Sequence, residues 1–586
     1  MENNTTKTTP PNENELQENY AQLIRKQALK NAAKYGKAEP GKLIGKIIAD
    51  DPTLKTKTKA LLPLIEQICN QINALSEQER ELEIKTTYPE LLEPKQQEQK
   101  ERDLFSFVKV MPGMAITTAF PPDPSKYPHI GHAKAALLNY LFAKKHQGRF
   151  ILRFEDTNPL LPKLEFYEQF IKDLTWLGII PDKIVYASDH IDFLYTVIEQ
   201  FLKDEKAYVC TCSPEKVKES REQCLACECR SQTPADALKA YDALRSKGQE
   251  GEGIVRLKID LSHENTTMRD PTVFRVILTP HPRIGTKYRL WPTYDFQNAL
   301  LDAYDRVTHR FRSKEFELRN ELQGLIQEWA GYPRTQIYEF GRFNITGVPS
   351  SGRIIREMIA NNQLIGWDDP QLHTLVALRR RGFTPEGICQ FLLSTGITKN
   401  EAVQTWDDLI VNNKKIVDKT ANRYFMVEHP QYLFVQGTPQ KQVFLKDHPE
   451  KEQRTRAFQI NDRFLISQQD FAKLQMLPEG SMVRLMDCLN ATKTNEGWVY
   501  HSEEYAPYKE AKTEKMIIHW LSYDEPHVSV ELFMPDHTII QGLAEKTINR
   551  LQVGDLVQFE RVGFCRLDKK EQTPKGEQYT FWFTHK

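Results

Sequence analysis

The stretch MAITTAFPPDPSKYPHIGHAKAALLNYLFAKKHQGRFILRFED (residues 114–156) decides the fold class. Its apolar run MAITTAF predicts a strand, GHAKAALLNYLFAKK predicts a helix, and GRFILRFED predicts a second strand. The pattern continues with the helix EFYEQFIKDLTWLGI, the strand KIVYAS and the segment FLYTVIEQFLKDEKAYV. Strands and helices that alternate in this way form a parallel, doubly wound sheet, whose ligands bind at the carboxyl ends of the strands.

Two histidines, His129 and His132, lie three residues apart where the first predicted helix begins. At this spacing both imidazoles face the same way, beside the free N–H groups and the positive end of the helix dipole. Gly131 between them carries no side chain, which lets a flat ring approach the backbone. The arrangement predicts a phosphate site, and the alternative is a pair of exposed histidines at a helix start.

Changes of composition divide the rest of the chain. We expect a disordered polar tail over 1–18, followed by a small helical domain and a charged linker over 19–103. An apolar stripe at helical spacing supports this domain, formed by Leu61, Leu64, Ile65, Ile68, Ile72 and Leu75. After about residue 365 the sequence predicts helices, and from about 425 to 586 it predicts one or two β-barrels.

Lysine plus arginine equals aspartate plus glutamate at 79 each, so the net charge does not indicate a nucleic-acid partner. Residues 21–60 are locally basic, which indicates either a solvated helical face or an RNA contact, and LRRRGF (378–383) has the same two interpretations. We find neither a run of about 18 apolar residues nor a secretory signal. The sequence therefore predicts a cytoplasmic protein without membrane contact, and nothing in it demands more than a monomer.

Five of the nine cysteines fall between residues 210 and 229. Cys210 and Cys212 form one C-x-C pair, Cys227 and Cys229 form another, and Cys224 is a fifth thiol. In a reducing compartment such a cluster favours metal binding over disulfides. Two pairs brought together by a helical hairpin form a tetrahedral S₄ site that suits structural zinc. Free thiols are the alternative, and Cys224 could replace Cys227 as a ligand.

The segment PHIGHAKAALLNY (128–140) resembles the HIGH signature of class I aminoacyl-tRNA synthetases. PPDPSKYPHIGHAKAALLN and ILRFEDTNP are similar to the glutamyl/glutaminyl group of that family. The similarity runs from about residue 20 to the C-terminus and is strongest to archaeal-type glutamyl enzymes. It includes the segments WPTYDFQNALLD, VTHRFRSKEFE, GWDDPQLHTLVALRRRG and VGDLVQFERVGF.

This resemblance implies an α/β multidomain protein with a Rossmann-like core. The core's catalytic halves would cover 104–205 and 276–362, flanking an acceptor-stem-binding insertion over 206–275. A helical stem-contact domain over 363–425 and anticodon-binding β-barrels over 426–586 would follow. The resemblance implies ATP-dependent ligation of L-glutamate to tRNA(Glu), and possible use of tRNA(Gln), through glutamyl adenylate, with Mg²⁺ and structural Zn²⁺. The alternatives are a glutaminyl-tRNA synthetase and a tRNA-binding paralogue with impaired catalysis.

The resemblance also implies site residues. His129 and His132 would hold the ATP phosphates, and Glu155 would pair with the substrate's α-ammonium group. Arg312 would separate glutamate from glutamine, because a guanidinium favours an anionic substrate. In full, the implied residues are, for catalysis, His129, His132, Ser350 and Arg353; for ATP, Pro122, His129, Gly131, His132, Ser351 and Arg353; for the amino acid, Glu155, Tyr294, Asn298 and Arg312; and for zinc, Cys210, Cys212, Cys227 and Cys229.

The chain departs from the family at two places. Ala119 in TTAFPP stands where relatives carry an arginine of the substrate pocket, so either another group supplies that charge or glutamate binds poorly. Lys126 is a candidate for the missing charge. In VPSSGRII (348–355), Ser351 and Gly352 stand where the family's loop lysine and its neighbour are expected. Arg353 either contacts the ATP phosphates in place of that lysine or is an exposed loop cation.

Overall fold

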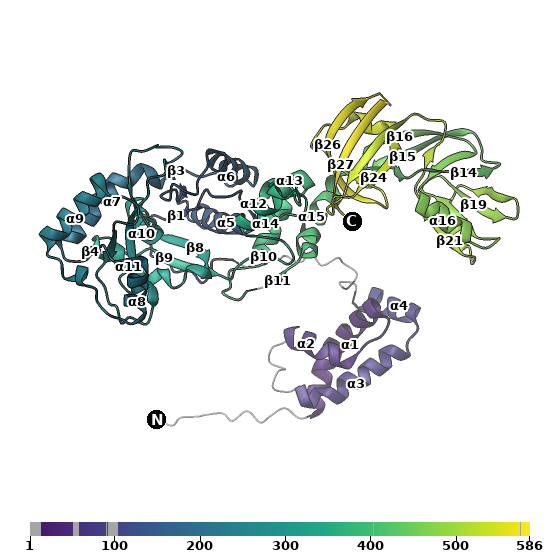
Figure 1. Cartoon of the computed structure of the whole chain (residues 1–586). Coiled ribbons are helices and arrows are strands. Elements are labelled where there is room, and N and C mark those ends of the chain that lie inside the picture. The colour runs from purple at the N-terminus through teal and green to yellow at the C-terminus, as the bar shows by residue number, and fades with distance from the viewer. Residues whose placement is uncertain (1–12, 51–57, 89–90, 92–102, 402, 575) are drawn as a thin grey trace, which may run out of the picture. The chain divides into compact units, whose positions relative to one another are not determined.

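The computed structural model describes residues 13–50, 58–88, 91, 103–401, 403–574 and 576–586, and the chain divides into two compact units, Met1–Asp103 and Leu104–Lys586. The described residues of the first unit form the helices α1 (Glu13–Tyr35), α2 (Pro40–Asp50), α3 (Thr58–Ala74) and α4 (Glu77–Thr87) (Figure 1). The predicted apolar stripe lies on α3, where Leu61, Ile65, Ile68 and Ile72 are buried against α1 and α2. This unit therefore has a core of its own.

Helix α1 begins at Glu13, inside the stretch 1–18 for which the sequence predicts disorder. The helix extends this far because ENELQ contains residues of high helix propensity. Residues 1–12, and most of the predicted linker, 92–102, lie outside the described residues, as does the part of the basic stretch over 51–57. In the part of the chain that the structure describes, no helix is both long and apolar enough to cross a membrane.

The second unit is built on a parallel sheet, which confirms the predicted fold class. Its strand order is β3-β2-β1-β8-β9. The strands are β1 (Thr117–Phe120), β2 (Arg149–Phe154), β3 (Lys183–Tyr186), β8 (His309–Ser313) and β9 (Gln336–Phe340). Helix α5 (Ile130–Lys145) packs on β1, β2 and β8, and α6 (Leu164–Trp176) shares its apolar cluster. Side chains that point to the other face of β2 and β8 reach α10 (Tyr294–Tyr304), which contacts α11 (Arg319–Trp329).

An antiparallel sheet is inserted between β3 and β8. Its strands are β4 (Ala207–Cys210), β5 (Ile254–Leu257), β6 (Thr272–Val276) and β7 (Leu290–Pro292), in that order. The helices α7 (Ile191–Lys203), α8 (Pro214–Glu222) and α9 (Pro234–Lys247) accompany it. The inserted sheet extends past the predicted boundary at 275, because β7 pairs with β6 before the chain enters α10.

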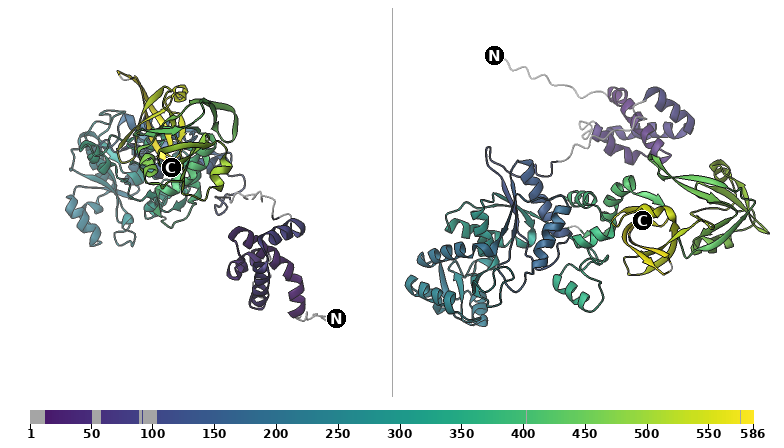
Figure 2. Two further views of the ribbon diagram at one scale, coloured as in Figure 1. Left: turned by 90° about the vertical axis from the view of Figure 1, so that its right-hand side faces the viewer. Right: turned by 90° about the horizontal axis from the view of Figure 1, so that it is seen from above.

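Helices then lead into two β-sheets. The helices are α12 (Gly352–Ala360), α13 (Leu375–Arg381), α14 (Pro385–Ser394) and α15 (Trp406–Thr420), and β10 (Asn344–Ile345) pairs with β11 (Val403–Gln404) near them. One sheet curls into a nearly closed barrel (Figure 2), in the order β12 (Asn422–Tyr424), β25 (Leu556–Phe559), β26 (Gly563–Thr573), β27 (Gly576–His585), β23 (His527–Phe533), β24 (Ile539–Glu545) and β13 (Met426–Glu428).

The other sheet has the order β21 (Lys515–Ile518), β18 (Met482–Leu485), β19 (Leu489–Thr494), β20 (Gly497–Ser502), β14 (Gln431–Gln436), β17 (Arg463–Ile466) and β22 (Leu521–Ser522). A hairpin of β15 (Lys441–His448) and β16 (Lys451–Ile460) and the helices α16 (Gln468–Met476) and α17 (Tyr505–Glu510) complete this region. The C-terminal part is therefore rich in strands, as the sequence predicts.

The arginines of LRRRGF bind the protein itself. Arg379 pairs with Asp173 of α6 at 3.1 Å, and Arg380 pairs with Asp368 and Asp568. Arg381 is buried and donates to the backbone carbonyls of Pro370 and Thr584. These contacts join helix α13 to the barrel-like sheet. The three arginines therefore bind within the fold, which is neither the solvated face nor the RNA contact that the charge pattern indicated.

Arg456 of β16 is expected to be important for the stability of the C-terminal part. Its guanidinium is 1% exposed and lies 2.9 Å from the carboxylate of Glu545 and 3.4 Å from that of Glu560. We expect Arg456→Leu to lower the free energy of unfolding by about 3–5 kcal/mol, because buried carboxylates lose their cation. Arg463, whose pair with Asp524 is exposed, provides the control, and Arg463→Leu is expected to cost at most about 1 kcal/mol. Urea unfolding at pH 7 tests this, and equal losses in both variants would contradict it.

Candidate active site

A cavity of about 520 Å³ lies at the carboxyl ends of the parallel strands. It brings together eight of the residues that the resemblance implies: Pro122, His129, Gly131, His132, Glu155, Tyr294, Arg312 and Ser350. Lys126, Arg310, Arg319 and Arg342 add positive charge to its wall. Asn298, Ser351 and Arg353 are not part of the lining. The cavity therefore has the location that a doubly wound sheet predicts and a wall suited to anions.

His129 and His132 form a capping box at the start of α5. The backbone N–H of Gly131 donates to His129 Nδ1 at 3.1 Å, and the backbone N–H of His129 donates to His132 Nδ1 at 3.2 Å. The two rings are stacked with centroids 3.8 Å apart. Gly131 leaves room for this contact, because a Cβ at this position would lie 3.0 Å from His129 Cε1 and the imidazole would have to shift. The flat ring that approaches this glycine is thus the protein's own imidazole.

These contacts fix the protonation of both imidazoles. Burial lowers the pKa of His129 and of His132 well below the ordinary value, and the positive charge of Lys126 lowers both further. The rings are therefore neutral at pH 7. Because each Nδ1 accepts a hydrogen bond, the single proton of each ring lies on Nε2. Two N–H donors remain for a ligand at the positive end of the helix, which is an arrangement that binds phosphate.

Glu155 follows β2 and lies in the wall of the cavity, where its backbone N–H donates to the carbonyl of Pro122 at 2.9 Å. Its carboxylate accepts from Arg153 Nε at 2.8 Å and from the amide of Gln297. Burial raises the pKa of this carboxyl group, and the Arg153 guanidinium opposes the shift. Each oxygen has a second lone pair, so the carboxylate can still accept from a ligand's ammonium group.

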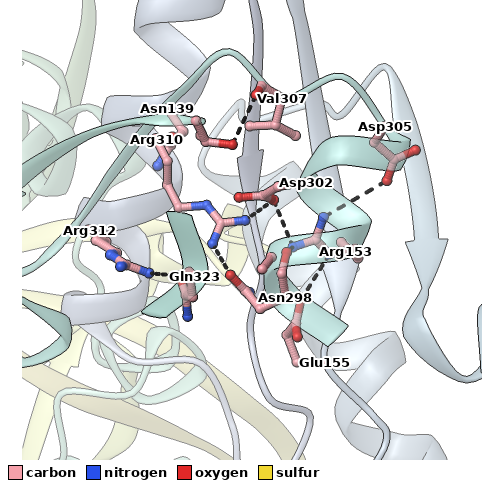
Figure 3. Close-up of polar contacts among 12 residues, drawn as sticks. Asn139, Arg153, Glu155, Asn298, Asp302, Asp305, Val307, Arg310, Arg312 and Gln323 are labelled. Carbon is pink, nitrogen blue, oxygen red and sulfur yellow. Dashed lines mark hydrogen bonds and ion pairs between the residues drawn. The ribbon is translucent and has the colours of Figure 1, made fainter. Parts of the chain in front are cut away.

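Arg312 presents a charge that the protein does not neutralise. The residue is 6% exposed, and its guanidinium donates to the amide oxygen of Gln323 at 2.9 Å (Figure 3). It also donates to the amide oxygen of Asn320. Both partners are neutral, and no carboxylate lies within ion-pair distance of Arg312 in the described part of the chain. Tyr294, on the same wall, keeps its proton because burial raises its pKa. This end of the cavity is therefore suited to a carboxylate ligand.

Asn298 is placed differently from the expectation. It is fully buried on α10, and its amide oxygen accepts from Arg310 (Figure 3). Arg310 itself lines the cavity and is the residue that sequence reasoning missed. The available signal was the alternation in HRFRS, where Arg310 and Arg312 share one face of a strand. In this position Asn298 orients an arginine rather than a substrate.

The loop before α12 also differs from the expectation. Lys126 lines the cavity and its ammonium group donates to the carbonyl of Ser350 at 3.3 Å. Arg353 is exposed on the first turn of α12, which Ser351 precedes as its N-cap. A Cβ at Gly352 would lie 3.2 Å from Cβ of Lys126, so the lysine side chain passes over this glycine. The β1–α5 loop thus contributes a cation to the cavity wall, and Arg353 does not.

A second cavity, of about 480 Å³, shares residues with the first. Asp123, Glu155, Tyr294 and Arg319 line both. The second cavity extends to Arg221 of the insertion. The histidine site is therefore continuous with a space between the parallel sheet and the inserted sheet.

The cysteine cluster fits a zinc ion. The thiol groups of Cys210, Cys212, Cys227 and Cys229 all lie within 4.8 Å of one another, and the Sγ atoms of the pairs 210/227 and 212/229 are 3.9 Å apart. Four sulfurs at about 2.3 Å from a tetrahedral zinc ion are separated by roughly 3.8 Å, so the spacing agrees. It is too long for a disulfide. Burial raises the pKa of Cys212 to about 12, so the thiolate form of this cysteine at pH 7 requires a bound cation.

The elements that hold the cluster differ from the predicted helical hairpin. Cys210 ends β4, and Cys229 lies in a 3₁₀ turn, Glu228–Ser231, with only α8 between the two C-x-C pairs. Cys224 is exposed and does not belong to the group, so it does not replace Cys227.

Comparison with known proteins identifies the relatives of this chain. Residues 115–419 match the family described as class I tRNA synthetases (E and Q), catalytic domain, and residues 421–501 and 517–568 match two anticodon-binding domain families of the same group. A glutamate–tRNA ligase of Pyrococcus abyssi is 38% identical over 96% of this chain and 99% of its own length. One of Nitrosopumilus maritimus is 35% identical over 96% and 99%. A crystal structure of a glutamate tRNA ligase from Elizabethkingia meningosepticum covers 53% of this chain and 71% of its own, at 19% identity and a TM-score of 0.41.

Proposed function

The chain belongs to the class I tRNA synthetases for glutamate and glutamine, and we propose that it ligates L-glutamate to tRNA(Glu) through a glutamyl adenylate. ATP with Mg²⁺ and the tRNA are the other substrates. The enzyme acts as a cytoplasmic monomer. The structure supports the choice of glutamate chiefly through Arg312, whose charge has only neutral partners inside the cavity. A buried, uncompensated cation favours glutamate over the isosteric but neutral glutamine.

The ATP side of the proposal rests on the histidine pair. Two Nε2–H donors at the start of α5 bind the phosphates and stabilise the charge that develops as pyrophosphate leaves, with Pro122 and Gly131 beside them. Lys126, whose ammonium group donates to the carbonyl of Ser350, adds its positive charge to the phosphate site. Glutamate lies with its ammonium group at Glu155 and its side chain toward Tyr294 and Arg312. Catalysis then depends on holding the two substrates in line, because the residues supply position and charge rather than a nucleophile.

The second cavity, which reaches the insertion, supports a path by which the tRNA enters the active site. The second cavity runs from Glu155 and Tyr294 to Arg221. The 3′ end of the tRNA enters there and meets the adenylate, while the zinc held by the four cysteines stabilises the insertion. The strand-rich C-terminal region, which matches the anticodon-binding families, contacts the anticodon.

The test is attachment of labelled glutamate, and separately of glutamine, to matched tRNA(Glu) and tRNA(Gln) in the presence of ATP and Mg²⁺. We expect glutamate to be attached to tRNA(Glu) and glutamine to neither tRNA. Attachment of glutamine would assign the chain to the other branch of the family. Binding of tRNA without attachment of either amino acid would contradict an enzymatic role and indicate a tRNA-binding paralogue.

Lys126 provides a further prediction. Because its ammonium group lines the cavity beside the histidines, Lys126→Met is expected to raise the KM for ATP by about 10- to 100-fold. Arg353→Ala is the matched control, since Arg353 is exposed and outside the lining, and its effect is expected to stay below about threefold. Steady-state charging at varied ATP measures both. A larger effect at Arg353 than at Lys126 would assign the loop cation to Arg353.

A further inference from the structure

Ala119 and Arg310 are neighbours on two strands of the parallel sheet. Thr118 of β1 pairs with His309 of β8. Since side chains alternate along a strand, the residues that follow this pair, Ala119 and Arg310, point to the same face and lie side by side. Strands in a sheet are about 4.8 Å apart, which is well within the reach of an arginine side chain. The position that lacks a cation thus has an arginine directly beside it.

The strand on the other side of β1 contributes a second arginine. Arg153 of β2 and Arg310 of β8 both pair with the same oxygen of Asp302 on α10, Arg153 at 2.9 Å (Figure 3). Both guanidiniums are at most 1% exposed, and Ala119, on the strand between them, is fully buried. At position 119 β1 therefore contributes only a methyl group, while its two neighbours place their cations on one carboxylate of α10.

Arg310 is also part of the cavity wall, together with Glu155, Tyr294 and Arg312. Asn298 and Asp302 hold two of its nitrogens, which fixes the direction of the side chain. Arg310 shares the Asp302 carboxylate with Arg153, whereas Asp295 pairs with Arg319 alone. Its buried Nε has no hydrogen-bond partner in the described part of the chain. Leaving a buried donor unpaired is unfavourable, and a carboxylate oxygen of a ligand would satisfy it.

We propose that Arg310 replaces, from the neighbouring strand, the arginine that relatives carry at position 119, and that its guanidinium contacts a carboxylate of the amino acid. This inference rests on the proposed function, because the ligand is taken to be glutamate. Lys126, the other candidate for the missing charge, is bonded to Ser350 instead. An arginine at position 119 in addition to Arg310 would add a third buried guanidinium to a face on which Arg153 and Arg310 already share Asp302. We therefore expect an arginine at one of the two positions, 119 or 310, but not at both.

An exchange of the two residues tests the proposal. The proteins compared are the wild type, Arg310→Ala, Ala119→Arg and the double variant that carries both changes. Arg334→Ala, which removes an exposed pair with Glu328, is the control for loss of an arginine. For each protein, the KM for glutamate, the KM for ATP and kcat are measured in tRNA charging, and thermal unfolding verifies the fold.

We expect Arg310→Ala to raise the KM for glutamate by about 100-fold or more while the KM for ATP changes less than about threefold. Ala119→Arg alone is expected to reduce charging by about tenfold or more, because the added charge is buried without a partner. The double variant is expected to return to within about tenfold of the wild-type KM for glutamate. A folded Arg310→Ala protein with an unchanged KM for glutamate would overturn the proposal, as would a folded double variant that binds glutamate no better than Arg310→Ala.

Failure of this inference can be distinguished from failure of the proposed function. If the wild type charges no tRNA with glutamate, the proposed function is wrong. Binding of free glutamate, measured by its effect on thermal unfolding, then decides the role of Arg310. A rise in Tm that glutamate causes in the wild type and that Arg310→Ala abolishes supports the role, and no rise in the wild type removes it. If Arg310→Ala does not fold, the double variant decides in the same way.

Discussion

Arg312→Gln is expected to lower kcat/KM for glutamate by about 100- to 1,000-fold. The wild-type guanidinium is buried, oriented by Gln323 and Asn320, and free of a carboxylate partner, so its charge is available to the substrate. Loss of one partner of a buried, charge-assisted pair costs about 2–5 kcal/mol, and each 1.4 kcal/mol is a factor of ten. Glutamine loses no such pair, so its use is expected to fall much less. Initial rates of charging with each amino acid measure the change in preference.

Arg319→Gln is the matched control for this experiment. Arg319 lines the same cavity, but its guanidinium lies 2.5 Å from the carboxylate of Asp295, which already neutralises it. The same loss of charge at this position is expected to change kcat/KM for glutamate by less than about tenfold. If kcat/KM for glutamate fell equally in both variants, the total positive charge of the cavity, and not Arg312 in particular, would select the acidic substrate.

Local sequence spacing was sufficient to predict the strand–helix–strand core and the histidine pair. The spacing of His129, Gly131 and His132 determines a capping box, because every hydrogen bond involved joins residues within one turn. That Cys210 pairs with Cys212, and Cys227 with Cys229, was predicted for the same reason, since each C-x-C pair is local, and the structure places the four thiols together. The predicted helical hairpin was wrong, because one pair lies at the end of strand β4 and the other at a 3₁₀ turn, with the single helix α8 between them.

Features that depend on contacts between distant segments could not be predicted. That Arg310 lies beside Ala119 follows from the pairing of β1 with β8, whose residues are far apart in the sequence. Sequence alone offered Lys126 instead, because it lies nearer along the chain. Likewise the arginines of LRRRGF looked like an RNA contact or a solvated face, and only the fold brings Asp173 and Asp568 to them. The sequence shows where a charged residue lies along the chain, but only the structure shows which residue it pairs with.

The cysteine cluster is expected to bind one zinc ion per chain, and Cys210→Ser is expected to lose it. Cys210 is fully buried and lies 3.9 Å from Cys227, so a serine there removes a thiolate from the middle of the site. Structural zinc sites bind with apparent free energies of about 10–16 kcal/mol, and that energy contributes directly to folding. We therefore expect the insertion around β4 and α8 to unfold locally in the variant, and tRNA charging to fall with it.

Cys224→Ser is the control variant. It removes a cysteine of the same region without removing one of the four clustered thiols. Cys224 is exposed and outside the group of four, so this variant is expected to keep its zinc and its activity. Metal analysis of protein purified without added zinc gives the stoichiometry, and limited proteolysis reports on the insertion. Well under one equivalent in the wild type, or equal zinc in Cys210→Ser and the wild type, would contradict a tetrahedral thiolate site. An ion held by four protein thiolates would have no open position, so we expect it to stabilise the insertion without taking part in the chemistry.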